Sequence, residues 1–262
     1  MKGVPLEATL RARRDEGRKL LVPYVTGGLR QDWPQLLLAM ADRGADAIEV
    51  GLPFSDPMMD GPTIQEASRL ALERGTNTGT VLAELRGLDV PVPLVVMTYC
   101  NLVFRAGTKR FAAEVATAGV TGAIVPDLPL EESEEWEADA AAEGVETVLL
   151  AAPVTPPDRL DLICRRSHGF VYGVNLMGVT GARANLASSS AVLAQRLKAV
   201  TTKPVLMGFG ISGPDQAVEA TRFADGVVVG AALMRAAIDG ATPEQVGELV
   251  GAIRAAIDGG RA

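Results

Sequence analysis

The chain has 262 residues, of which 48% are hydrophobic, so it is long enough to bury a full core. No linker-like stretch or shift in composition divides it, and we expect one domain over residues 1–262. The formal net charge is −7, with basic residues scattered among acidic ones, which argues against a nucleic-acid-binding surface. The N-terminus lacks an apolar signal core and no apolar run is long enough to span a membrane, so we expect a cytoplasmic protein without membrane contact. The two cysteines, Cys100 and Cys164, have no paired spacing, which argues against a disulfide framework and a zinc site.

Short apolar runs alternate with longer amphipathic stretches along the chain. The first stretch, Leu6–Glu16, is predicted to be an extra helix that covers one end of the fold. The eight apolar runs, each predicted to be a strand, are Leu20–Thr26, Ala47–Gly51, Pro93–Met97, Gly122–Pro126, Glu146–Ala151, Gly169–Val174, Pro204–Gly208 and Gly226–Gly230. The helices predicted between them are Asp32–Arg43, Thr63–Glu73, Lys109–Ala118, Leu130–Glu143, Pro157–Arg166, Ala191–Val200 and Gly213–Phe223.

Continuous apolar character, rather than alternation, is typical of parallel strands that are covered on both faces. Gly44, Gly119 and Gly144 lie where the preceding helices should end. Eight strand–helix units predict an α/β fold, a (β/α)8 TIM barrel, with a doubly wound open sheet as the alternative. In such barrels the active site lies at the carboxyl ends of the strands.

Two carboxylates stand out near the second predicted strand. Glu49 lies within it, and an ionised carboxylate among apolar residues costs several kcal/mol unless its surroundings compensate. One interpretation is a buried acid paired with a base to hold the barrel together, and the other is a catalytic acid. A Pro- and Gly-rich loop then leads to Asp60, which is either an ordinary turn residue before a helix or a second acid at the same mouth. Two acids so placed would support proton transfer.

Residues 47–66, AIEVGLPFSDPMMDGPTIQE, resemble the signature of the tryptophan synthase alpha subunit family. Further matching motifs are PYVT at 23–26, YCNLVF at 99–104, VPDLP at 125–129, GVTG at 178–181 and GFGIS at 208–212. The resemblance spans nearly the whole chain. It implies cleavage of indole-3-glycerol phosphate to indole and glyceraldehyde 3-phosphate, without a cofactor.

The resemblance also implies roles for the two acids. Glu49 would carry a proton between the side-chain hydroxyl and indole C3, and Asp60 would accept a hydrogen bond from the indole N–H and stabilise the positive ring. We expect the apolar setting to raise the pKa of Glu49, so that it holds a proton near neutral pH. The residues agree with cofactor-free chemistry, because no Lys lies within a predicted strand to form an imine. The only histidine, His168, precedes the sixth strand at the opposite end, so no metal site is predicted.

A set of substrate-binding residues follows from the same resemblance. The residues expected to line the indole and glycerol pocket are Tyr24, Ile64, Tyr99, Tyr172 and Phe209, with Thr180 placed against Asp60. Glycine-containing turns after strands 6, 7 and 8 are expected to bind phosphate through backbone N–H groups of Gly181, Gly210, Gly230 and Ala231, although glycines there could simply allow tight turns.

Some positions depart from the family pattern. The family usually has Ser at position 231, so one hydroxyl contact is missing, and the turn Gly27–Arg30 and the segment Asn175–Met177 also differ. Residues 178–190 are rich in Gly, Ala and Ser and are expected to form a loop that closes over the substrate.

The family's alpha subunit docks on a pyridoxal-phosphate beta subunit as an α2β2 assembly. The matching interface positions are Asp56, Pro57, Asn101, Phe104 and Pro129. Residues 102–104 form an apolar cluster in a predicted loop, which would either face a partner or pack on its own barrel. Two alternatives stay open: a stand-alone lyase that releases indole for secondary metabolism, and a non-catalytic regulator of the beta subunit, which the two acids disfavour.

Overall fold

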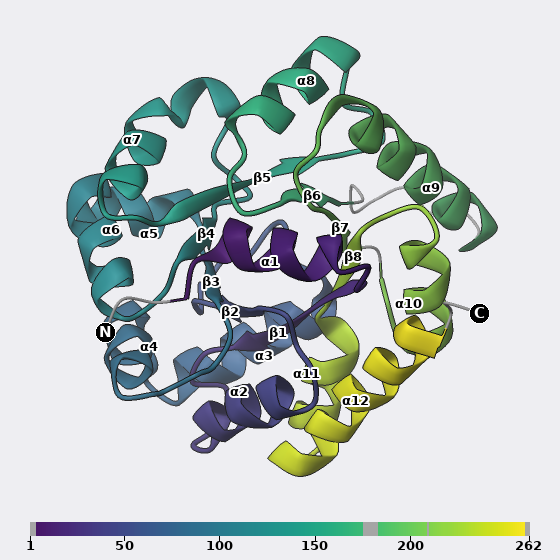
Figure 1. The fold of residues 1–262 in the computed structure, drawn as a ribbon. Coiled ribbons are helices and arrows are strands. Elements are labelled where there is room, and N and C mark those ends of the chain that lie inside the picture. The colour runs from purple at the N-terminus through teal and green to yellow at the C-terminus, as the bar shows by residue number, and fades with distance from the viewer. Residues whose placement is uncertain (1–3, 175–182, 209, 260–262) are drawn as a thin grey trace.

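The computed structural model describes residues 4–174, 183–208 and 210–259, with the backbone alone described for residues 183–188. Eight parallel strands form a closed barrel in chain order, and β8 pairs with β1 (Figure 1). The strands are β1 (Leu20–Thr26), β2 (Ile48–Gly51), β3 (Leu94–Met97), β4 (Gly122–Ile124), β5 (Glu146–Ala151), β6 (Val171–Gly173), β7 (Val205–Met207) and β8 (Gly226–Val229). The predicted TIM barrel is confirmed, and each predicted strand agrees with the structure to within two residues at either end.

Helices surround the barrel on all sides (Figure 1). They are α1 (Leu6–Asp15), α2 (Trp33–Asp42), α3 (Pro62–Glu73), α4 (Thr78–Arg86), α5 (Cys100–Ala106), α6 (Thr108–Thr117), the 3-10 turn η1 (Leu130–Glu132), α7 (Glu134–Ala142), α8 (Pro157–Arg166), α9 (Arg183–Val200), α10 (Pro214–Thr221), α11 (Ala231–Ile238) and α12 (Pro243–Gly259). The apolar faces of the helices pack on the outside of the sheet, in a core that includes Trp33, Leu36, Phe111 and Trp136.

The structure corrects several predictions. The segment that includes Phe104 is the helix α5 rather than a loop, with Val103 fully buried on its inner side. Residues 183–190, predicted as part of a closing loop, are the first half of α9, while 178–182 lie outside the described residues. The stretch Leu130–Glu143 is divided into η1 and α7 at Ser133. The helices α4, α11 and α12 were not predicted.

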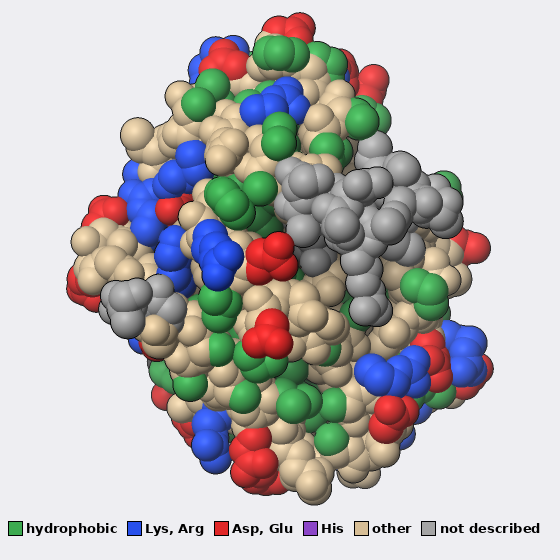
Figure 2. All heavy atoms as spheres, turned by 90° about the vertical axis from the view of Figure 1, so that its right-hand side faces the viewer, with side chains coloured by type: hydrophobic (Ala, Val, Ile, Leu, Met, Phe, Trp, Pro, Cys, Tyr) green, Lys and Arg blue, Asp and Glu red, His purple; other side chains and the backbone are tan. Residues whose placement is uncertain are grey.

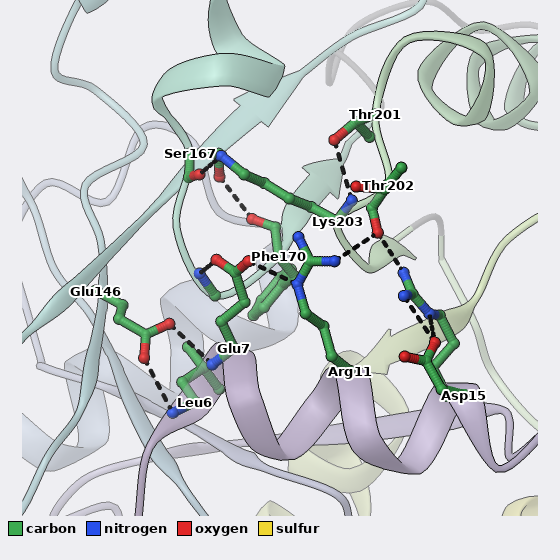
Figure 3. A network of polar contacts seen from close by, with 12 residues as sticks. Leu6, Glu7, Arg11, Asp15, Glu146, Ser167, Phe170, Thr201, Thr202 and Lys203 are labelled. Atoms are coloured by element: carbon green, nitrogen blue, oxygen red, sulfur yellow. Dashed lines mark hydrogen bonds and ion pairs between the residues drawn. The ribbon is translucent and has the colours of Figure 1, made fainter.

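The helix α1 closes the amino-terminal end of the barrel, as expected. Leu6 and Leu10 are fully buried against the lowest side chains of the barrel interior. Glu146, the first residue of β5, accepts hydrogen bonds from the backbone N–H groups of Leu6 (3.2 Å) and Glu7 (2.8 Å) (Figure 3). Pro5, which precedes α1, has no side-chain group to cap the helix, so this distant carboxylate satisfies two amides that the helix itself leaves unpaired.

A fully buried carboxylate ties both ends of the chain to the barrel. Asp46, just before β2, has no exposed surface and accepts hydrogen bonds from Arg13 (2.8 Å), Arg18 (2.8 Å) and Arg254 (3.0 Å). It also accepts one from the backbone N–H of Leu21 at 2.8 Å. The two carboxylate oxygens therefore connect α1, the start of β1 and α12 at the end opposite to the acid pair.

Charged side chains of both signs are scattered over one face of the molecule (Figure 2). On the face that carries α9, α10 and α12, Lys and Arg side chains are interspersed with Asp and Glu side chains (Figure 2). None of the helices in the described ranges is both long enough and apolar enough to cross a membrane.

Candidate active site

A cavity of about 760 Å³ opens at the carboxyl ends of the strands. Every strand contributes one side chain to its lining: Tyr24, Glu49, Met97, Ile124, Leu150, Tyr172, Met207 and Val228. The loops above add Asp60, Gly208, Gly210 and Gly230, and α3 adds Ile64. The cavity also reaches Gln216, Glu219 and Phe223 on or beside α10, which the sequence reasoning did not include.

Glu49 points into this cavity from β2. It pairs in register with Tyr24 of β1, is only 2% exposed, and its Oε2 has no hydrogen-bond partner among the described residues. Burial, followed by the repulsion of the nearby Asp60 carboxylate, raises the pKa of Glu49 from 4.5 to about 8. The expected proton-bearing state near neutral pH is therefore supported, whereas a structural ion pair with a base is not.

Asp60 faces the same cavity from the loop between β2 and α3. It is 8% exposed and accepts a hydrogen bond from the Tyr99 hydroxyl at 2.9 Å. Burial raises its pKa to about 6, and the hydrogen bond from Tyr99 opposes that rise. Two acids thus share one cavity with different proton affinities, the arrangement that acid–base catalysis requires.

The three tyrosines of the chain all lie at these acids. Burial raises the pKa of Tyr24 and of Tyr172, and the carboxylates of Glu49 and Asp60 add to the rise, so both hydroxyls stay neutral. The Tyr24 hydroxyl shares a hydrogen bond of 3.2 Å with Thr26. Gly51 makes room for it, because a Cβ atom there would lie 1.9 Å from the hydroxyl oxygen.

The glycine-containing turns after β7 and β8 form another part of the cavity. Gly208 and Gly210 follow β7, while Gly230 and Ala231 lead from β8 into α11, and all four line the cavity. The first amides of α11 have no partner within their helix, so they can donate to an anion. Three of the predicted substrate-binding residues, Thr180, Gly181 and Phe209, lie outside the described residues.

Comparisons with known proteins bear on this arrangement. A family model described as "Tryptophan synthase alpha chain" matches residues 10–252. The chain belongs to the tryptophan synthase alpha chain family. The tryptophan synthase alpha chain of Gloeobacter violaceus is 43% identical over 92% of this chain and 88% of its own length. That of Streptomyces coelicolor is 41% identical over 97% of this chain and 94% of its own length.

Solved structures of the family share the fold. A chain of Mycobacterium tuberculosis tryptophan synthase superposes with a TM-score of 0.89 at 36% identity, covering 98% of this chain and 99% of that one. The tryptophan synthase subunit alpha of Legionella pneumophila has a TM-score of 0.88 at 32% identity, covering 97% and 98% of the two chains. The tryptophan synthase alpha resemblance seen in the sequence is thereby confirmed.

The predicted partner-facing residues lie around the same end of the barrel. Asp56, Asn101, Phe104 and Pro129 are exposed and Pro57 is half-buried. Met58 (83% exposed) and Met59 (42%) stand in the same loop as Asp56, and Phe104 on α5 is 46% exposed. The two methionines were not predicted as part of this surface, although two apolar residues next to Pro57 in an exposed loop can indicate a contact site.

Proposed function

We propose that the chain cleaves indole-3-glycerol phosphate to indole and glyceraldehyde 3-phosphate by acid–base chemistry. The observation that carries the proposal is the pair Glu49 and Asp60, two buried acids in one cavity whose pKa values of about 8 and about 6 differ. Between these values Glu49 holds a proton while Asp60 is ionised. Family membership supports the same reaction, since the relatives are named for tryptophan synthase.

The reaction then follows from the two ionisation states. The substrate phosphate binds at the amides of Gly230 and Ala231, which sets the indole toward the acids. Protonated Glu49 donates its proton to indole C3. The positive charge that spreads to N1 is stabilised by the Asp60 carboxylate, which accepts a hydrogen bond from the N1–H. Glu49, now ionised, takes the proton of the side-chain hydroxyl. As the carbonyl forms, the C3–carbon bond breaks and its electron pair restores the neutral indole, so Glu49 ends protonated as it began.

We also propose that a tryptophan synthase beta subunit is the partner. Support comes from the apolar side chains of Met58 and Phe104, whose exposure is unfavourable without a covering surface. A stand-alone lyase remains the second candidate, because Glu49 and Asp60 are assembled within this one chain.

One assay separates these possibilities. Indole release from indole-3-glycerol phosphate is measured with the purified chain alone and with a beta subunit added. Rapid release by the chain alone favours the stand-alone lyase, and release that needs the beta subunit favours the synthase subunit. Activation of the beta subunit without cleavage would show a regulator. Glu49→Gln should abolish cleavage while the protein stays folded, and full turnover by this variant would overturn the assigned roles.

A further inference from the structure

Tyr99 contacts Asp60 from behind and does not belong to the cavity lining. We expected Tyr99 to line the pocket, but it is not among the side chains that line the cavity and instead packs against the β2–α3 loop. Its hydroxyl donates to Asp60 Oδ2 at 2.9 Å and accepts from the backbone N–H of Met59 at 3.1 Å. An N–H can only donate, so the single hydroxyl proton of Tyr99 is left for Asp60. An ionised Asp60 can only accept, so in that state the Tyr99 hydroxyl is the donor.

Two further contacts hold the Tyr99 ring in place. The ring stacks on Phe54 of the same loop, with centroids 4.9 Å apart and planes at 21°. Tyr99 also stands directly before α5, where its own side chain does not cap the helix. Asp127, from the loop after β4, instead accepts a hydrogen bond from the backbone N–H of Cys100 at 2.8 Å. The VPDLP motif thus supplies a carboxylate that fixes the turn carrying Tyr99.

Within the described ranges, no comparable donor reaches Oε2 of the other acid. Glu49 Oε2 is buried without a hydrogen-bond partner among the described residues, and the neighbouring Tyr24 hydroxyl is engaged with Thr26. A hydrogen bond donated to a carboxylate favours its ionised form. The ionised form is therefore stabilised in Asp60 by a donor that Glu49 Oε2 lacks, although both side chains are buried.

We propose that Tyr99, anchored through Asp127, is a positioning residue that keeps Asp60 anionic and facing the cavity and so leaves Glu49 as the proton carrier. The expected change in the pH profile of kcat/KM rests on the proposed function. The expected change in the pKa of Asp60 concerns the substrate-free protein and does not. Tyr99 acts through Asp60 and needs no contact with the substrate.

The test compares Tyr99→Phe with the unchanged protein. Carboxyl carbons of aspartate are labelled with 13C and titrated by NMR in the substrate-free protein, and the Asp60 signal is identified by its loss in Asp60→Asn. In Tyr99→Phe the pKa of Asp60 should rise by about one to two pH units, since a hydrogen bond to a charged group is worth that much. The pKa that sets the acid limb of the kcat/KM profile should rise by the same amount, which lowers kcat/KM at pH 6 by about five- to fifty-fold.

Two further variants sharpen the comparison. Tyr24→Phe removes a cavity hydroxyl that is hydrogen-bonded to Thr26 rather than to Asp60. Because Tyr24 lines the cavity, the variant can lower turnover, but it should do so without moving the acid limb. Asp127→Ala removes the anchor of the turn and should shift the acid limb in the same direction as Tyr99→Phe, by less. Circular dichroism and denaturant midpoints confirm that each variant is folded.

The outcomes separate the inference from the proposed function. An unchanged Asp60 titration in folded Tyr99→Phe would overturn the inference, as would a loss of activity with no movement of the acid limb. If the pKa of Asp60 is raised in Tyr99→Phe but the unchanged protein releases no indole, with or without a beta subunit, the positioning role is supported and the proposed reaction is refuted.

Discussion

The burial of Glu49 predicts that the proposed catalytic acid destabilises the fold. Its pKa is 4.5 for an ordinary glutamate and about 8 here, and each pKa unit corresponds to about 1.4 kcal/mol. Ionising Glu49 in the folded protein therefore costs about 5 kcal/mol, a large part of the 5–15 kcal/mol that typically separates folded from unfolded chains. Replacing Glu49 with Gln removes this cost because the amide is never charged.

The sign of the pH dependence follows from proton linkage. Between pH 4.5 and about 8 the folded protein holds the Glu49 proton and the unfolded chain has lost it. The free energy of unfolding therefore falls as the pH rises through this window and stays low above it. In Glu49→Gln this contribution is absent, so the variant should match the unchanged protein near pH 4.5 and exceed its stability by several kcal/mol above pH 8.

Urea unfolding of both proteins at about pH 5, 7 and 9 checks this prediction. The difference in free energy of unfolding should grow steadily with pH, while indole release by the variant is abolished throughout. A matched control is Glu248→Gln, because Glu248 is an exposed residue of α12. If the stability difference between Glu49→Gln and the unchanged protein is the same at all three pH values, the argument from burial fails.

Three other substitutions test separate features. Asp46→Ala removes the buried carboxylate that accepts from Arg254 Nη1 and the backbone N–H of Leu21, although Arg254 keeps its ion pair with Asp258. The variant should cost about 3–5 kcal/mol, seen as a lower denaturation midpoint, and a cost below about 1 kcal/mol would contradict this role of Asp46. Gly51→Ala puts a Cβ atom 1.9 Å from the Tyr24 hydroxyl and should lower indole release at least tenfold, on the order of 1.4 kcal/mol or more, whereas Gly87→Ala, with ordinary contact at 3.7 Å, should not. Thr98→Val removes a buried hydroxyl that has no partner among the described residues and should raise stability by about 1 kcal/mol; a decrease would show that the hydroxyl is satisfied.

The strands could be predicted because strands of a parallel barrel are buried on both faces and therefore appear in the sequence as continuous apolar runs. Helix prediction was less complete, although signals were present in two of the missed helices. Asn77 and Thr80 form a capping box at the start of α4, and Val246 and Val250 belong to a buried face of α12. The helix α5 is only seven residues long and is capped by Asp127 from another loop, so its own sequence carries a weak helix signal.

The acids and part of the cavity lining, Tyr24, Ile64 and Tyr172, were predicted, but the contacts that hold the acids in place were not. Strand periodicity does not say which face of β2 points inward. The structure shows it, because Glu49 and its register partner Tyr24 both line the cavity. The Tyr99–Asp60 bond joins positions 39 residues apart and the Arg254–Asp46 bond joins positions 208 apart. Such contacts depend on how the barrel closes, so they cannot be predicted from a local sequence pattern.

The placement of the aromatic residues gives the protein an internal reporter. Its three phenol groups all stand beside the two acids, whereas both indole side chains, Trp33 and Trp136, are buried in the outer shell between barrel and helices. Ultraviolet difference bands of tyrosine should therefore follow entry of the non-aromatic product glyceraldehyde 3-phosphate, since the indole ring of the substrate would itself absorb and emit in this range. Tryptophan emission should follow the integrity of the shell. Occupancy and unfolding can be monitored in one unlabelled sample, at separate wavelengths.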